Sequence, residues 1–364
     1  MFTTIRGVQG IAQMEYPVAS AYKCITLSAT DWLDEPLAMG ERTVYTTSAW
    51  LTFLAKTQAG HPVRAALMDG TKTVGYFTGL VIQKLGLKIL GSPFPGWTTD
   101  YMGLSLSAEA DRRRALQAVI DLAFRQLGCV HLEMMDRHIS EADLQGLGCL
   151  YRLYHTFELD LSQSEDELFA AMSSACRRCI RKAEKEGVLI EYAEPHAFAE
   201  EYYGQLKDVF AKQRLVPPYQ IGRVRELIHQ LYPTGHLLLL RARDRQGRSV
   251  ATGIFPHLNG TMYFWGGASW RAHQSCRPNE ALQWFAMQRA RELGVRIYDM
   301  GGSGEYKRKY GGRDILVPWF RKSKYSWLGQ LLIVAQRSHA FYQRCLGQME
   351  HLHVTQACHR HELP

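Results

Sequence analysis

Residues 298–312, YDMGGSGEYKRKYGG, combine an acid at the end of a strand-like run, a glycine-rich turn and a basic aromatic stretch. Glycines let backbone N–H groups approach an anion closely, and basic side chains add positive charge. The glycines are Gly301, Gly302 and Gly304, and the cations are Lys307, Arg308 and Lys309. The pattern indicates an anion-handling turn in which Asp299 orients a group in the adjoining cleft. A structural glycine turn with solvated cations is the alternative.

The loop over residues 92–101, SPFPGWTTDY, carries the second group of candidates. Its many rings make it stiff, and it presents Trp97, Asp100 and Tyr101 between a strand and a helix, where loops often bind ligands. A packed cover over the end of a sheet is the alternative interpretation.

A third candidate is the basic stretch over residues 176–185, CRRCIRKAEK. Three- and four-residue spacing puts its cations on one face of a helix, which suits phosphates or a tRNA backbone, although a solvated face is an equally good explanation. The cations are Arg178, Arg181, Lys182 and Lys185. Cys176 and Cys179 lie inside the helix, and no second pair stands at ligand spacing, so we predict no metal site.

The composition is that of an ordinary globular protein, with 46% hydrophobic and 21% charged residues. A formal charge of +8 favours anionic partners, although solubility alone explains it equally well. No Gly-x-Ser-x-Gly elbow, Walker A loop or Gly-x-Gly-x-x-Gly turn is found, which argues against a serine nucleophile, nucleotide hydrolysis and dinucleotide redox chemistry. Scattered cysteines and the lack of a signal peptide or bilayer-length apolar run predict a cytoplasmic protein.

An internal repeat organises the elements that position these residues. RQLG at 125–128 and RELG at 291–294 each end a helix-like segment, 166 residues apart, and glycine is the natural helix terminator. Each is followed by a short strand-like run in which an acid precedes a methionine, Glu133-Met134 and Asp299-Met300. Each half therefore runs through helices, antiparallel strands, a crossover helix and two more strands.

The hydrophobic pattern assigns these elements along the chain. In the first half we predict helices over 49–58 and 108–127 and strands over 63–68, 74–83, 87–90, 129–134 and 151–161. In the second half we predict helices over 164–187, 197–213, 221–231 and 279–293, and strands over 236–242, 250–257, 261–265, 295–299 and 316–320. The halves extend over 1–161 and 162–324, without a long linker between them, and a helical tail follows over 325–364.

The second half resembles the FemAB-like and BioF2-like (CelD type) acyltransferases of the GNAT superfamily. PNEALQWFAMQRARELGVRIYDMGGSGEYKRKYGG looks like the C-terminal signature of that group: a helix ending in glycine, a strand ending in aspartate, a glycine turn and an aromatic-Lys-x-x-aromatic-Gly segment. RRCIRKAEKEGV is similar to the first helix of the same domain. The resemblance covers about 162–323 in sequence and the first half in layout only.

This resemblance implies an α+β fold of tandem GNAT-like domains, with mixed, mostly antiparallel sheets flanked by helices, and transfer of an acyl or aminoacyl group. Lys307, Asp299 and Tyr298 would carry out catalysis. Asp100, Tyr101 and Trp97 would bind the acceptor. The donor would contact Arg277, Asn279, Glu280, Gly302, Gly304 and Arg308. Residues 270–280, WRAHQSCRPNE, depart from ordinary GNAT acetyltransferases because they lack the glycine pair that cradles the CoA pyrophosphate.

Three functions stay open at this point. The first is acyl transfer from acyl-CoA, without a tightly bound cofactor, to an amine on a cell-envelope polysaccharide or related precursor. The second is aminoacyl-tRNA-dependent transfer to a peptidoglycan precursor, and the third is a non-catalytic binding protein on the same fold. The acceptor would be a small molecule or a lipid-linked sugar or peptide, met in the cytoplasm or at the inner face of the membrane. The tail over 325–347 would pack on its own domain or lie on the membrane surface.

Overall fold

The computed structural model describes residues 22–32, 40–94, 96–212, 215–302 and 304–325. The first half contains β1 (Lys23–Thr26), α1 (Ser48–Gln58), β2 (His61–Asp69), β3 (Lys72–Lys84), β4 (Leu87–Ser92), β5 (Leu104–Leu106), α2 (Arg112–Asp121), β6 (His131–Met135), α3 (Glu141–Leu144) and β7 (Leu150–Asp160). Short 3-10 and π turns, Val44–Thr46 and Leu122–Gln126, precede α1 and extend α2.

The second half repeats this plan with a longer helical opening. It contains α4 (Glu165–Ala171), α5 (Ser174–Lys185), β8 (Leu189–Tyr192), α6 (Phe198–Lys212), α7 (Ile221–Leu231), β9 (Leu237–Arg243), β10 (Ser249–Leu258), β11 (Thr261–Tyr263), β12 (Gly266–Ser269), α8 (Pro278–Glu292), β13 (Ile297–Asp299) and β14 (Arg313–Ser323). Short 3-10 helices occupy Tyr232–Thr234, Arg271–Cys276 and Glu305–Tyr310.

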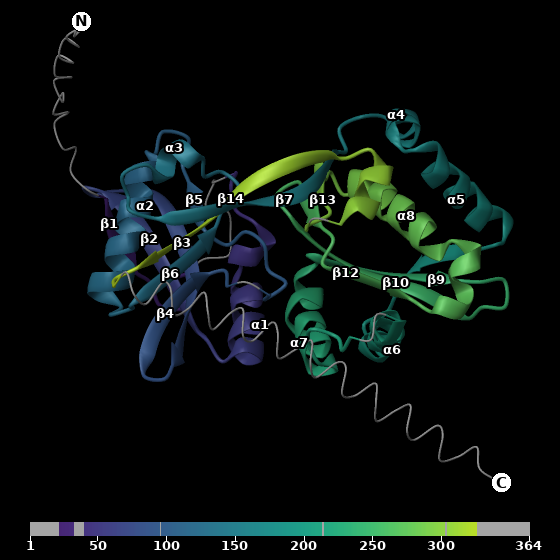
Figure 1. The fold of residues 1–364 in the computed structure, drawn as a ribbon, viewed down its shortest axis with the longest axis horizontal. Coiled ribbons are helices and arrows are strands. Elements are labelled where there is room, and N and C mark those ends of the chain that lie inside the picture. The colour runs from purple at the N-terminus through teal and green to yellow at the C-terminus, as the bar shows by residue number, and fades with distance from the viewer. Residues whose placement is uncertain (1–21, 33–39, 95, 213–214, 303, 326–364) are drawn as a thin grey trace, which may run out of the picture.

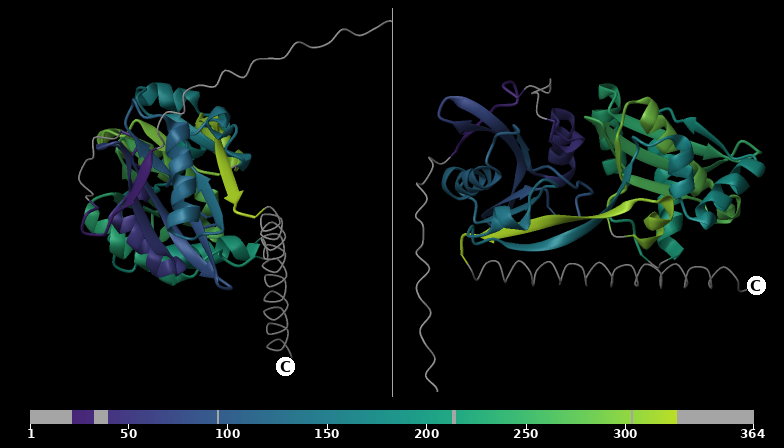
Figure 2. Two further views of the ribbon diagram at one scale, coloured as in Figure 1. Left: turned by 90° about the vertical axis from the view of Figure 1, so that its left-hand side faces the viewer. Right: turned by 90° about the horizontal axis from the view of Figure 1, so that it is seen from above.

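The sheet joins the two halves by exchanging their last strands. Strands β1 to β4 are antiparallel and β4 runs parallel to β6, just as β8 to β11 lead to the parallel pair of β11 and β13. However, β7 of the first half pairs with β13, and β14 of the second half pairs with β6. The two exchanged strands also pair with each other, so one continuous ribbon bridges the two lobes (Figure 1). Figure 2 shows this ribbon running along the length of the molecule.

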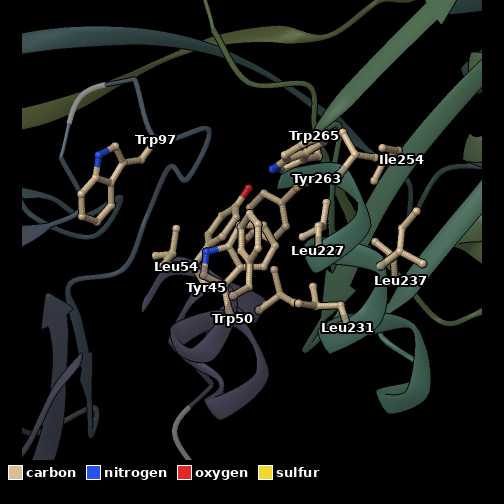
Figure 3. Packing of buried hydrophobic residues seen from close by; sticks show 14 of the residues in the cluster. Tyr45, Trp50, Leu54, Trp97, Leu227, Leu231, Leu237, Ile254, Tyr263 and Trp265 are labelled. Carbon is tan, nitrogen blue, oxygen red and sulfur yellow. The ribbon is translucent and has the colours of Figure 1, made fainter. Parts of the chain in front are cut away.

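Three hydrophobic cores hold the molecule together. One lies within each lobe, and the third lies between the lobes, where α1 and α7 face each other. In this third core Trp50 and Leu54 of α1 meet Leu227 and Leu231 of α7, and Trp50 is fully buried (Figure 3). This shared core joins the two halves, which no long linker separates in the sequence.

The predicted repeat of elements is confirmed, with most ends shifted by a few residues, but the short elements β1, β5, α3, β8 and β12 were not predicted. Gly128 and Gly294 have left-handed φ angles of 68° and 74°, as the prediction of two glycine helix ends requires. The Asn259-Gly260 turn between β10 and β11 also has positive φ at both residues, the conformation that favours a tight hairpin.

The single helix predicted over 164–187 is wrong, because the chain forms α4 and α5 there. The capping box of Ser164 and Glu167 starts α4 as predicted. The helix then stops at Met172, whose backbone is extended, and Ser173 begins α5 by accepting a hydrogen bond from the Cys176 N–H. The Ser173 N–H donates to the Lys309 carbonyl at 2.9 Å, so a tertiary contact stabilises the break.

Within the described residues, no helix is long and apolar enough to span a bilayer, and no cluster of three His, Cys, Asp or Glu side chains could hold a metal ion. The predicted tail over 325–364 lies outside the described residues, apart from Tyr325. The boundaries at 161 and 324 stay predictions, and the strand exchange means that each lobe contains a strand from the other half.

Candidate active site

A pocket of about 310 Å³ lies between the lobes, where the parallel strand pairs of both halves end. From the first half, Pro93 and Phe94 follow β4 and Met135 ends β6. From the second half, Phe264 and Trp265 follow β11, and Met300 to Gly302 follow β13. The remaining lining residues are Gly96, Thr98, Thr99, Asp100, Tyr154, Lys307 and Trp319. The repeated fold therefore places two equivalent strand ends around one site.

Lys307 is the cation of this pocket and belongs to the short helix Glu305–Tyr310. Its Nζ donates hydrogen bonds to the Met300 carbonyl at 2.8 Å and to the Gly301 carbonyl. The side chain is buried, and burial lowers its pKa, while the nearby Asp100 and Asp299 carboxylates oppose that shift. An ammonium group has three N–H donors, so one is left to face a ligand in the pocket.

Asp299 ends β13 and organises the glycine turn that follows. Its Oδ1 accepts hydrogen bonds from the Gly301 N–H at 2.7 Å and from the Thr156 hydroxyl at 2.6 Å. Gly301 and Gly302 have φ angles of 62° and 48°, which side chains other than glycine rarely adopt. The carboxylate therefore fixes the turn whose carbonyl groups hold Lys307.

Asp100 is half-buried in the pocket wall on the first-half loop, and its Oδ2 accepts a hydrogen bond from Tyr45 at 3.2 Å. Burial, reinforced by the negative charge of Asp299, raises its pKa to about 7, although Tyr45 and Lys307 favour the charged form. A carboxyl group with this pKa can gain and lose a proton near neutral pH, as a general base must. The structure therefore brings Asp100, Asp299 and Lys307 into one electrostatic cluster.

The other two predicted acceptor residues, Tyr101 and Trp97, do not line the pocket and are buried next to the residues that do. Tyr101 is buried, and its hydroxyl lies close enough to Thr156 and Asp299 to interact with both. Trp97 is also buried, with its ring 4.9 Å from that of Phe94 and its carbonyl bonded by Arg223. Neither residue lines the pocket, so both support the loop that presents Asp100.

Tyr298 lies away from the pocket. Its fully buried hydroxyl donates to the Gln283 side chain at 2.5 Å, and burial raises its pKa well above the usual value. Successive side chains of a strand point to opposite faces, so Tyr298 and Asp299 cannot both face one site.

The predicted donor residues fall into three places. Gly302 lines the pocket, and Gly304 caps the short helix that carries Lys307. Arg308 faces elsewhere, because its guanidinium pairs with Glu305 and Asp314 at 2.9 and 2.7 Å.

The third place is the start of α8. Arg277 is exposed there in the left-handed conformation, and the Asn279 amide donates to the Ser269 hydroxyl at 3.0 Å. Glu280 forms an ion pair with Lys309 at 2.7 Å, and this pair lies under the basic helix α5. Arg178, Arg181, Lys182 and Lys185 of α5 are exposed, as the spacing predicted.

Sequence reasoning missed the aromatic walls of the pocket. Tyr154 comes from β7 and Trp319 from β14, with their rings 6.5 Å apart, and Trp265 follows β11. Arg152 lies over the Trp319 ring at 4.2 Å. The sequence predicted both β7 and β14 as strands. Only the exchange of these strands between the halves shows that Tyr154 and Trp319 border the same pocket.

The domain class and the fold can be compared with those of known proteins. Residues 170–309 match the model of the acetyltransferase (GNAT) domain family. No curated protein matches the chain by sequence.

Among solved structures, FemX has a TM-score of 0.65 at 14% identity, over 78% of this chain and 94% of its own. A tandem GNAT protein from the clavulanic acid biosynthesis pathway has a TM-score of 0.52 at 13% identity, over 84% and 99% of the two chains. L-PGS from Bacillus licheniformis has a TM-score of 0.50 at 13% identity, over 80% and 96%. Residues 170–309 therefore contain an acetyltransferase (GNAT) domain, and the whole chain shares the fold of FemX and of the tandem GNAT protein.

Proposed function

We propose that the chain transfers an acyl group from acyl-CoA to an amine on a cell-envelope polysaccharide or related precursor. The observation that carries this proposal is that Asp100, from one half, and Lys307, from the other, line the same pocket. The pair supplies a base with a pKa near neutrality and a hydrogen-bond donor for an oxyanion.

The chemistry follows from these two groups. The acceptor amine reaches the pocket mostly as an ammonium ion, and Asp100 takes one of its protons. The free amine attacks the thioester carbonyl carbon, and the third N–H of Lys307 donates to the oxygen as it becomes negative. The carbon–sulfur bond then breaks, which gives the amide and the CoA thiolate. The second proton of the nitrogen neutralises the thiolate.

The donor would reach the pocket along the second half. The thioester would enter where β11 and β13 end, and the CoA phosphates would lie near the start of α8. There the helix N-terminus and the exposed Arg277 attract anions, although the loop lacks the usual glycine pair. Asn279 and Glu280 would shape this entrance, with Lys309 holding Glu280.

A second candidate function is aminoacyl transfer from aminoacyl-tRNA to a peptidoglycan precursor. The exposed cations of α5 favour it, because they form a surface for a phosphate backbone, and so does the similarity to FemX and L-PGS. Both reactions would use the same pocket, on a small or lipid-linked acceptor in the cytoplasm or at the inner face of the membrane.

Calorimetric titration separates the candidates. We expect acetyl-CoA to bind at micromolar to millimolar concentration, with binding weakened in Arg277→Ala. Binding of tRNA that is strong and falls steeply with salt, together with no response to millimolar acetyl-CoA, would instead favour the aminoacyl reaction. If neither donor binds and Lys307→Ala retains cellular function, the chain is a binding protein on a retained fold.

A further inference from the structure

The hydroxyl group of Tyr154 lies at the pocket and has no hydrogen-bond partner among the described residues. Tyr154 belongs to β7, and its ring lies 6.5 Å from the ring of Trp319 on β14. The side chain is only partly exposed, but its oxygen is not enclosed by protein atoms, so it reaches the space of the pocket. A phenolic O–H in this position can donate a hydrogen bond to a bound ligand.

The glycine turn leaves open space between this hydroxyl and Lys307. A Cβ atom on Gly302 would lie 3.4 Å from the Tyr154 Oη and 3.5 Å from the Lys307 Nζ, so both groups border the same point. A Cβ atom on Gly301 would lie 3.6 Å from the Asp100 Oδ2. Because glycine has no side chain, the space beside the turn stays free for a ligand. A hydroxyl, an ammonium group and a carboxyl group therefore border one small region of the pocket.

The surrounding groups keep the Tyr154 hydroxyl protonated at neutral pH. Burial, followed by the negative charges of Asp100 and Asp299, raises its pKa to about 12. Arg152 of the same strand opposes this shift, and its guanidinium lies 4.2 Å from the centre of the Trp319 ring. The hydroxyl is therefore a neutral donor under the conditions in which Asp100 would act as a base.

We propose that Tyr154 is a catalytic residue whose O–H donates a second hydrogen bond, beside that of Lys307, to the thioester oxygen as this oxygen becomes negative. The inference rests on the proposed acyl transfer and adds a residue to its chemistry. Donors that are already in place where charge develops stabilise the transition state more than the ground state. No proton leaves Tyr154, so the residue is unchanged after each turnover. The first half thus supplies the base and one oxyanion donor, and the second half supplies the other donor.

Tyr154→Phe tests this role, because it removes the hydroxyl and keeps the ring. In CoA release from acetyl-CoA, with glucosamine as the amine probe, we expect kcat to fall by about 10²-fold. KM for acetyl-CoA should stay within about threefold of the wild-type value. The hydroxyl has no protein partner to lose, so the melting temperature should not change. Tyr151→Phe, at an exposed tyrosine of the same strand, is the matched control and should keep the wild-type kcat.

A second substitution separates a chemical role from a structural one. Tyr154→3,5-difluorotyrosine nearly keeps the shape of the side chain but makes the hydroxyl more acidic, so the group loses its proton at a lower pH. We expect activity near that of the wild type at about pH 7, because the donor is still present, and a loss of activity at high pH that begins earlier than in the wild type. A side chain that only supports the pocket wall would leave the pH profile unchanged.

The choice of acyl donor distinguishes a hydrogen bond to the acyl oxygen from protonation of the leaving sulfur. S-phenyl thioacetate releases a more acidic thiol than acetyl-CoA does, and such a thiolate needs less help from an acid. If Tyr154 acts on the oxygen, Tyr154→Phe should lower kcat/KM by the same factor with both donors, after subtraction of the uncatalysed reaction. A loss confined to acetyl-CoA would overturn the inference, because the hydroxyl would then act on sulfur.

Other results would also refute this role of Tyr154. A wild-type kcat in Tyr154→Phe, or an unchanged pH profile with difluorotyrosine at this position, would refute the inference while leaving the proposed function intact. A wild-type protein that releases no CoA from acetyl-CoA in the presence of glucosamine would refute both the inference and the proposed function.

Discussion

The Thr156 hydroxyl donates a hydrogen bond of 2.6 Å to Asp299, although 143 positions separate the two residues in the chain. Thr156 lies on β7, which belongs to the first half but pairs with β13 of the second. A carboxylate that holds the glycine turn beneath Lys307 is thus oriented by a strand from the other half. The exchange of strands couples the geometry of the site to the integrity of both lobes.

We expect Thr156→Val to lower kcat by about tenfold, because the Asp299 carboxylate loses about 1–2 kcal/mol of orienting hydrogen bond. Thr156→Ser keeps the hydroxyl and should retain most of the activity. KM for the donor should change little in both variants, as steady-state kinetics will show. An activity in Thr156→Val equal to that of Thr156→Ser would mean that the hydroxyl does not position Asp299.

A substitution of Phe320 tests whether the two lobes unfold together. It lies on β14, from the second half, but is fully buried in the first-lobe core. Phe320→Ala should cost about 3–5 kcal/mol, and the thermal unfolding of both lobes should shift together in one calorimetric transition. Leu85→Ala, at a fully exposed position, should leave the transition unchanged. Two separate transitions, with only one of them shifted, would show that the lobes unfold independently.

We expect Lys307 to stabilise the negative charge that develops on the thioester oxygen in the transition state. Lys307→Met preserves the stem and removes the charged donor, so kcat should fall by about 10²–10³-fold in a thiol-release assay with acetyl-CoA. Lys84→Met, at an exposed lysine of β3, serves as the control. A variant at position 307 that retains wild-type kcat would remove Lys307 from the chemistry.

The pH dependence should report Asp100. Its carboxyl must be ionised to accept a proton, and its pKa is raised to about 7, so kcat/KM should rise with pH and level off above about pH 7 to 8. Asp100→Asn should lose about 10²-fold or more in activity at pH 7.5, and this rise should disappear from its rate profile. Asp166→Asn, at an exposed acid of α4, should keep the profile of the wild type. A wild-type profile that is flat between pH 5 and 8 would contradict this role.

The Asp100 carboxyl should also make folding stability depend on pH. Stability should fall as pH rises, whereas activity should increase. Because folding raises its pKa from 3.8 to about 7, the folded state binds this proton more tightly, and stability falls as pH rises between these values. Asp100→Asn removes the penalty and should be more stable than the wild type above pH 7, by about 1–2 kcal/mol for a half-buried site, but not at pH 4. Thermal melts at both pH values test this, and an equal Tm difference at pH 4 and pH 8 would contradict it.

The sequence predicted most of the longer helices and strands, but not the short elements β1, β5, α3, β8 and β12. Glycine helix ends, the Asn259-Gly260 turn and the repeated acid-methionine strands depend on short-range chemistry, and the structure has them where expected. The helix break at Met172 was not predictable, since it depends on a contact between Ser173 and the distant Lys309. The exchange of β7 and β14 was missed for the same reason, because strand partners are chosen by the whole sheet.

The site residues likewise divide into those that the sequence predicted and those that it did not. The glycine turn and the resemblance pointed to Asp299, Lys307 and Asp100, which the structure brings together. Tyr298 was named beside Asp299 without regard to the alternation of side chains along a strand. Trp265 carried no sequence signal, because a ring near a strand end is ordinary until the structure places it in the lining of the pocket.

Release of CoA from acetyl-CoA by the purified chain, measured with and without an amine acceptor, tests the central claim most directly. We expect release that depends on the amine, yields one amide per CoA and is almost lost in both Asp100→Asn and Lys307→Met. CoA release that does not depend on the amine, or that persists in these two variants, would show that the acyl group is not transferred in the pocket between the lobes.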